Sequence, residues 1–130
     1  MRKALLLSLS PLVLVGCQTW GPTWSEVSGA RYDNRTDPYR LPAVISRIDD
    51  QGAFAQYPIK VEPGRHEIRL QGTLSGWKKG ETFETMVLTL EPCKRYYLNA
   101  QYPNLIEPRF TPIVDYVEDV AGCKMVASAR

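Results

Sequence analysis

His66 is the one histidine in the sequence and the side chain best suited to acid–base catalysis near neutral pH. Within residues 65–71, His66, Ile68 and Leu70 alternate with polar residues. This alternation places all three on the apolar face of a half-buried strand. A histidine in that position is more often a packed residue with one hydrogen bond than a catalytic base. We therefore predict a structural role for His66.

Other residue patterns that support catalysis do not occur in the sequence. A zinc site usually needs three or four Cys or His ligands, and three cysteines and one histidine lie far apart here. We find neither a glycine-rich phosphate loop nor a nucleophile elbow. The acids Asp49 and Asp50 fall in a predicted turn, whereas Glu118 and Asp119 adjoin on a strand and point to opposite faces. We predict a non-enzymatic protein without catalytic, metal-binding or cofactor-binding residues.

The first 17 residues have the pattern of a secretion signal that ends at a cysteine. Two basic residues precede an apolar stretch of 12 residues, 4–15, which is shorter than the about 20 residues of a membrane-spanning helix. Leu14-Val15-Gly16-Cys17 resembles the lipobox of bacterial lipoproteins. The resemblance implies cleavage after Gly16, a diacylglycerol thioether on Cys17 and acylation of the new amino terminus. The alternative is an ordinary secreted protein with a cysteine near its cleavage site.

The lipid would attach the mature protein to a membrane. Three acyl chains bind stably, whereas one chain binds marginally at about 0.8 kcal/mol per buried methylene. By resemblance to lipoprotein sorting rules, an Asp after the lipidated cysteine favours the inner membrane. Gln18 occupies that position and therefore favours the outer membrane, with the domain in the periplasm.

The charge balance of the mature chain argues against nucleic-acid binding. Removal of Arg2 and Lys3 leaves 14 of the 16 basic residues, which match the 14 acidic ones. Nucleic-acid binders need a basic surface that displaces counterions. The 114 residues that follow the signal suffice for one modest core, because a chain of this size buries roughly 60–70% of its unfolded surface.

Residues 17–40 are predicted to tether the lipid to a folded domain at 41–130. The stretch is rich in Gly, Pro, Ser, Asn and Asp and shows no helical or strand periodicity. Trp20 and Trp24 could lie among the lipid headgroups, as interfacial aromatic residues do, or fold back onto the domain surface. The sequence leaves both arrangements open.

From Leu41 onward the sequence predicts short strands joined by Gly- and Pro-containing turns. β-branched and aromatic residues alternate with polar ones, and ten prolines disfavour long helices. The fold class is therefore all-β, a single antiparallel β-sandwich of immunoglobulin-like or transthyretin-like shape. The expected strands are 43–48, 57–61, 65–71, 82–90, 94–102 and 113–120.

Residues 57–98 resemble the PEGA-type accessory domains of bacterial envelope proteins. The shared features are the segment Pro58–Leu70 with its Pro63-Gly64 turn, a following hairpin, and a strand that ends near Leu90. The match covers about a third of the chain. The turn around Trp77 and the paired cysteines depart from the pattern. The resemblance implies a non-catalytic sandwich.

Cys93 and Cys123 are predicted to form a disulfide. The compartment is oxidising, and lipid already occupies Cys17. If strand 94–102 returns antiparallel as strand 113–120, the two cysteines face each other with Cβ atoms about 4.5–5.5 Å apart. The alternative is a pair of free buried thiols. The assumed register pairs Tyr102 with Val114, Leu98 with Glu118 and Cys93 with Cys123.

The predicted hairpin tip Gly76-Trp77-Lys78-Lys79-Gly80 is a candidate contact site. Trp77 could stack on a sugar ring while Lys78 and Lys79 meet phosphate or carboxylate groups. The alternative is a tryptophan folded over the sheet edge beside solvated lysines. Three functions follow in order of preference: an accessory or scaffold protein for another envelope protein, a binder of peptidoglycan, lipopolysaccharide or other envelope glycan, and an enzyme.

Overall fold

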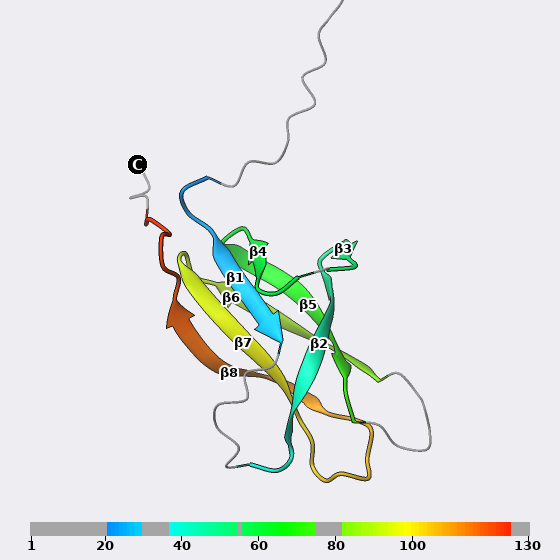
Figure 1. Ribbon diagram of the computed structural model, residues 1–130. Coiled ribbons are helices and arrows are strands. Elements are labelled where there is room, and N and C mark those ends of the chain that lie inside the picture. The colour runs from blue at the N-terminus through cyan, green and yellow to red at the C-terminus, as the bar shows by residue number, and fades with distance from the viewer. Residues whose placement is uncertain (1–20, 30–36, 55, 75–81, 126–130) are drawn as a thin grey trace, which may run out of the picture.

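The computed structural model describes residues 21–29, 37–54, 56–74 and 82–125, which form β-strands and no helix (Figure 1). The all-β prediction is confirmed. None of the described residues belongs to a helix that could cross a membrane. The strands are β1 (Ser25–Gly29), β2 (Arg40–Ile48), β3 (Gln51–Gly52), β4 (Ile59–Val61), β5 (Gly64–Gly72), β6 (Phe83–Leu90), β7 (Lys94–Gln101) and β8 (Thr111–Asp119).

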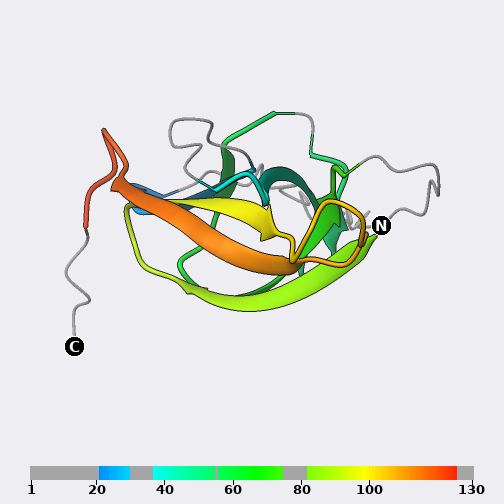
Figure 2. The ribbon, with the colours of Figure 1, turned by 90° about the horizontal axis from the view of Figure 1, so that it is seen from below.

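The strands form a sandwich-like fold in which β2 belongs to both layers. Residues 40–42 of β2 pair with β7, and residues 43–48 pair with β5. One layer therefore contains β4, β1, β7 and β8, and the other contains β3, β2, β5 and β6. Seen from below, β8 and β6 run along one side of the molecule in separate layers (Figure 2). They are the outermost strands of their layers, and their Cα atoms approach within 8 Å.

Alternating apolar residues build the core between the layers. In β5, Ile68 and Leu70 are fully buried while Glu67 and Arg69 are exposed, as the period-two pattern predicts. Burial of each large aliphatic side chain contributes about 1.5–3 kcal/mol. The core also contains Val27, Ala43, Ile45, Ile48, Ile59, Val61, Leu90, Tyr96, Leu98, Ala100, Tyr102 and Phe110.

Strand β1 corrects the tether prediction. Its residues lie inside the stretch 17–40, yet they form a central strand between β4 and β7. The prediction is wrong there because buried polar side chains hide the strand pattern. Ser25 is fully buried and donates to the Glu91 carbonyl at 2.8 Å. The pairing of β1 with β7 is parallel, whereas the remaining described pairs are antiparallel as predicted.

The predicted disulfide is present, but the register that suggested it is wrong. Cys93 and Cys123 have Cα atoms 5.4 Å apart and lie in the turns next to β7 and β8. Arg95 faces Glu118, and a bulge then places Leu98 opposite Val114. The observed register replaces the unfavourable apolar–acid pairing with an ion pair and an apolar contact.

Candidate functional site

The side chain of His66 lies between two oxygen atoms from different turns. Its Nδ1 is 2.6 Å from Oδ2 of Asp49, which follows β2. Its Nε2 is 2.6 Å from the carbonyl oxygen of Glu62, which precedes β5. The Glu67 amide donates to the other oxygen of Asp49 at 2.9 Å. The Glu67 amide and then His66 hold the pKa of Asp49 below its usual value.

Both partners of the His66 ring accept hydrogen bonds. Each of the two ring nitrogens lies within hydrogen-bond distance of one of these oxygens. Both nitrogens are thus occupied by oxygens of the same chain, whereas a general base needs a nitrogen that can reach the substrate proton. The geometry makes His66 a clamp between two turns. The position of His66 on the apolar face of β5 agrees with the sequence pattern. The pattern did not predict the contacts of both ring nitrogens, with Asp49 and with Glu62.

A pocket of about 440 Å³ opens beside this clamp. Asp49, Asp50 and Glu62 supply acids, and Lys60 supplies a basic group, while Ile48 and Phe54 supply apolar wall. The combination of a histidine with converging acids is one that an enzyme could use. However, the lining contains no Ser, Thr or Cys nucleophile. Within the part of the chain that the structure describes, no group of His, Cys, Asp and Glu is arranged to hold a metal ion.

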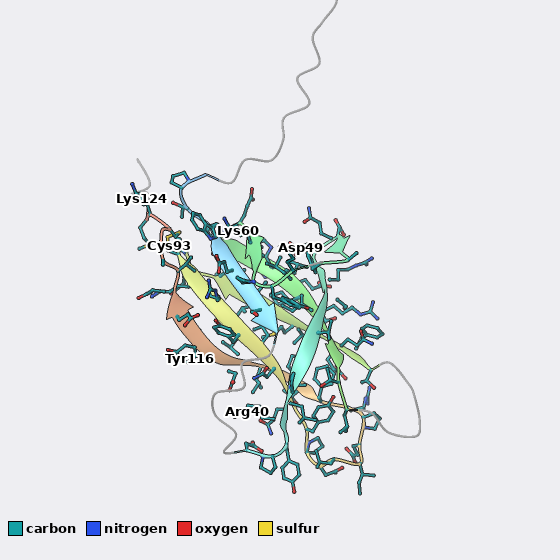
Figure 3. All side chains as sticks on the ribbon, in the orientation of Figure 1. Arg40, Asp49, Lys60, Cys93, Tyr116 and Lys124 are labelled. Carbon is teal, nitrogen blue, oxygen red and sulfur yellow. A yellow bond between two sulfur atoms is a disulfide. The ribbon has the colours of Figure 1, made fainter. Side chains whose placement is uncertain are left out.

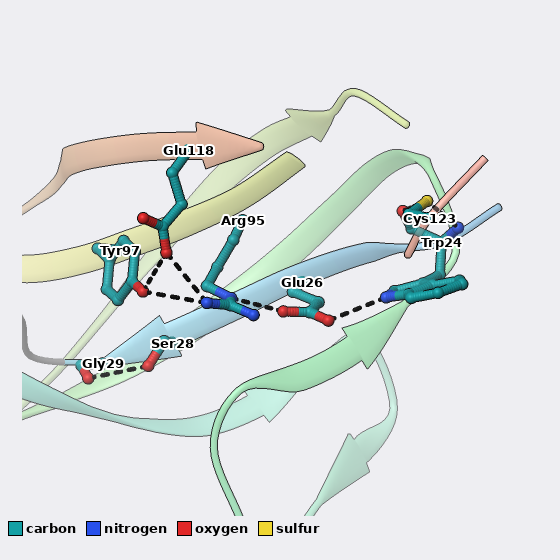
Figure 4. A network of polar contacts seen from close by, with 8 residues as sticks. All are labelled: Trp24, Glu26, Ser28, Gly29, Arg95, Tyr97, Glu118 and Cys123. Carbon is teal, nitrogen blue, oxygen red and sulfur yellow. Dashed lines mark hydrogen bonds and ion pairs between the residues drawn. The ribbon is translucent and has the colours of Figure 1, made fainter. Parts of the chain in front are cut away.

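A second polar cluster crosses β1, β7 and β8 in a single row (Figure 4). Arg95 lies 2.5 Å from Glu26 on one side and 3.0 Å from Glu118 on the other. Trp24 donates its indole N–H to Glu26 at 2.9 Å, and Tyr97 donates to Glu118 at 2.5 Å. Hydrogen bonds with Tyr97 and Glu26 raise the pKa of Arg95 against the opposing effect of burial. The row joins three strands and leaves no charged group free for chemistry.

Exposed large apolar side chains gather along one arm of the β7–β8 hairpin, residues 105–119. Five of the ten such residues on the described surface lie there. Ile106 at the tip is 91% exposed, and Val117 on β8 is 40% exposed. Because β8 pairs only with β7 among the described strands, its other edge carries unpaired backbone groups. The five residues are Leu105, Ile106, Val114, Tyr116 and Val117.

Two acids of β8, Asp115 and Glu118, are bonded to residues of neighbouring strands, whereas Glu107, Arg109 and Asp119 are exposed. Asp115 accepts hydrogen bonds from Arg40 at 2.7 Å and from Asn99 at 2.9 Å. Glu118 is held by Arg95. Edge strands usually discourage pairing by displaying charge, especially lysine, and β8 contains no lysine or arginine. Asp115 and Glu118 are therefore neutralised within the sheet, and Asp119 is the one fully exposed charge among the residues of β8.

The residues singled out from the sequence are only partly covered by the structure. Trp24 is half-buried and folded against the domain, the second of the two arrangements open for it. Cys17, Trp20 and the tip with Trp77, Lys78 and Lys79 lie outside the described residues. The apolar arm was missed because Asp115, Glu118 and Asp119 make its sequence look like an ordinary solvated edge.

Comparisons with known proteins add no relationship. No family model matches the chain, and searches of the curated proteins and of the solved structures find no match.

Proposed function

We propose that this protein is a non-enzymatic, lipid-anchored accessory protein of the bacterial envelope that binds another envelope protein through the arm 105–119. The observation that carries the proposal is the presence of exposed apolar side chains on β8, a strand with an unpaired edge, and on the loop that precedes it. Exposed apolar side chains and unpaired strand edges are features of protein interaction sites. The lipid on Cys17 would hold the arm near its partner.

The mode of binding that fits best is addition of a partner strand to β8. An added strand forms main-chain hydrogen bonds with the free edge and places its side chains on both faces of the sheet. Tyr116 lies opposite Tyr97 on one face, whereas Val117 lies opposite the buried Tyr96 on the other. Exposed side chains of β8 thus lie on both faces of the sheet.

The clamp at His66 argues for this proposal over an enzyme. Both ring nitrogens are engaged by oxygens of the same chain, and the pocket lacks a nucleophile. Glycan binding depends on Trp77, Lys78 and Lys79, which lie outside the described residues, and it stays a prediction.

Site-specific photocrosslinking in intact cells tests the proposal. A photoreactive residue replaces Val117 or Ile106, with Val44 as the control because it is 43% exposed on β2. The same envelope protein should be captured from both arm positions and not from Val44. Adding Val114→Lys should reduce capture at Val117 without lowering the melting temperature by more than a few degrees. Equal capture at Val44 would contradict the proposal.

A further inference from the structure

The two ends of the described chain are joined at one end of the sandwich. The Lys124 amide donates to the Pro22 carbonyl at 2.9 Å, and the Cys93 amide donates to the Trp24 carbonyl at 2.8 Å. The amide of Trp24 also lies 3.5 Å from the sulfur of Cys123. The incoming chain is therefore attached to both turns that the disulfide connects. We call this the anchored end, comprising residues 22–24, Lys60, the disulfide and residues 124–125.

The ring of Trp24 fixes the incoming chain further. Its N–H is bonded to Glu26, and Nζ of Lys60 lies 4.3 Å from the ring centroid. Lys60 belongs to β4 and Glu26 to β1, so the indole is held by two strands. Figure 3 shows Lys60, Cys93 and Lys124 at the end of the molecule where β1 begins, with Arg40 toward the opposite end.

Very little chain separates this end from the proposed lipid. Only residues 18–20 stand between Cys17 and Gly21, and four extended peptide links span at most about 14 Å. The headgroup layer of a bilayer is itself about 5–7 Å thick. The tether of residues 17–40 that the sequence predicts would allow a much greater distance.

We infer that the anchored end faces the lipid headgroups and that the apolar arm points away from the membrane. This inference rests on the proposed lipid attachment at Cys17. Lys60, Lys124 and the 74% exposed Met125 would lie closest to the bilayer. The exposed acids Glu62 and Glu91 balance the two lysines, so the short tether, and not net charge, sets the orientation.

The directions of β7 and β8 place the apolar arm relative to the anchored end. β7 starts beside Cys93 and runs away from the anchored end, and β8 returns from the loop 102–110. Seven residue steps of β7 cover about 23 Å. Leu105 and Ile106 lie beyond them, at the distal tip. The surface proposed to bind a partner therefore extends from the membrane outward.

Paramagnetic broadening from labelled lipids tests the orientation. The lipidated protein is reconstituted in nanodiscs of phosphatidylethanolamine and phosphatidylglycerol that contain a nitroxide-headgroup lipid, and amide signals are followed by NMR. We expect loss of the Thr23 and Lys124 amide signals and retention of Ile106. Equal loss at Ile106 and Lys124 would overturn the inference.

A longer tether provides the matched control. Insertion of about 20 Gly and Ser residues between Trp20 and Gly21 adds a mean reach of about 25 Å and should restore the lost signals. Persistent loss would contradict the role of the short tether. The intact mass separates the two proposals: absence of lipid on Cys17 overturns anchoring and orientation together, whereas lipid with uniform broadening overturns the orientation alone.

Discussion

The guanidinium of Arg95 lies 2.5 Å from a carboxylate oxygen of Glu26, whose side chain is only 6% exposed. The two residues face each other across the parallel pairing of β1 and β7. A carboxylate buried to this degree needs a counter-ion, because desolvation penalises an isolated charge. The guanidinium of Arg95 supplies this counter-ion. The pair holds β1 in the sheet despite its polar sequence.

Replacement of Arg95 by Met should strongly destabilise the domain. The change leaves the buried Glu26 without its partner, and loss of one member of a buried pair costs about 3–5 kcal/mol. Urea denaturation of the purified domain measures the change. The double variant with Glu26→Gln should recover part of the loss. Lys94→Met is the matched control on the same strand, because its partner Asp119 is 85% exposed, and it should have little effect.

Asp49→Asn should destabilise the protein near neutral pH and matter less in acid. The pKa of Asp49 is lowered from 3.8 in the folded state, so its carboxylate contributes stability above that pH. This contribution is lost as the pH falls through the folded pKa. Unfolding free energies measured across this range should converge for the two proteins. Asp50→Asn, which leaves the bonds to Glu67 and His66 intact, should not reproduce the pattern.

Joint replacement of Cys93 and Cys123 by Ser should lower the free energy of unfolding by about 3–4 kcal/mol, the chain-entropy value for a loop of this length. The cysteines are separated by 30 residues. Calorimetry of the oxidised and reduced protein measures the same contribution without substitution. Two alkylatable thiols in denatured protein from the periplasm would show that the bond does not form there.

Tyr102→Phe should reduce the loss of stability in alkali. Burial raises the pKa of Tyr102 from its usual 10.0, and the residue is 2% exposed. A raised pKa means that stability is fully present below pH 10 and falls as the pH rises toward the folded pKa. Equilibrium unfolding in alkali should show a shallower decline for the variant. Tyr39→Phe, at a position 42% exposed, should decline like the original protein.

The sequence by itself determined the strands whose side chains alternate, and therefore the all-β class. Ile68 and Leu70 identify the buried face of β5 from their spacing alone, since side chains of a strand alternate between faces whatever its partners are. Cysteine arithmetic and compartment similarly predicted the Cys93–Cys123 bond. These inferences needed only local periodicity or the number of available thiols.

The tertiary structure alone decided which strands meet and where the polar residues go. Strand β1 was hidden because Ser25 and Glu26 are satisfied by Glu91 and Arg95, residues 66 and 69 positions away. The second hydrogen bond of His66 likewise needs the Glu62 carbonyl to be placed by a turn. Polar composition predicts exposure unless a distant partner compensates for burial, and a distant partner is visible only once the chain has folded.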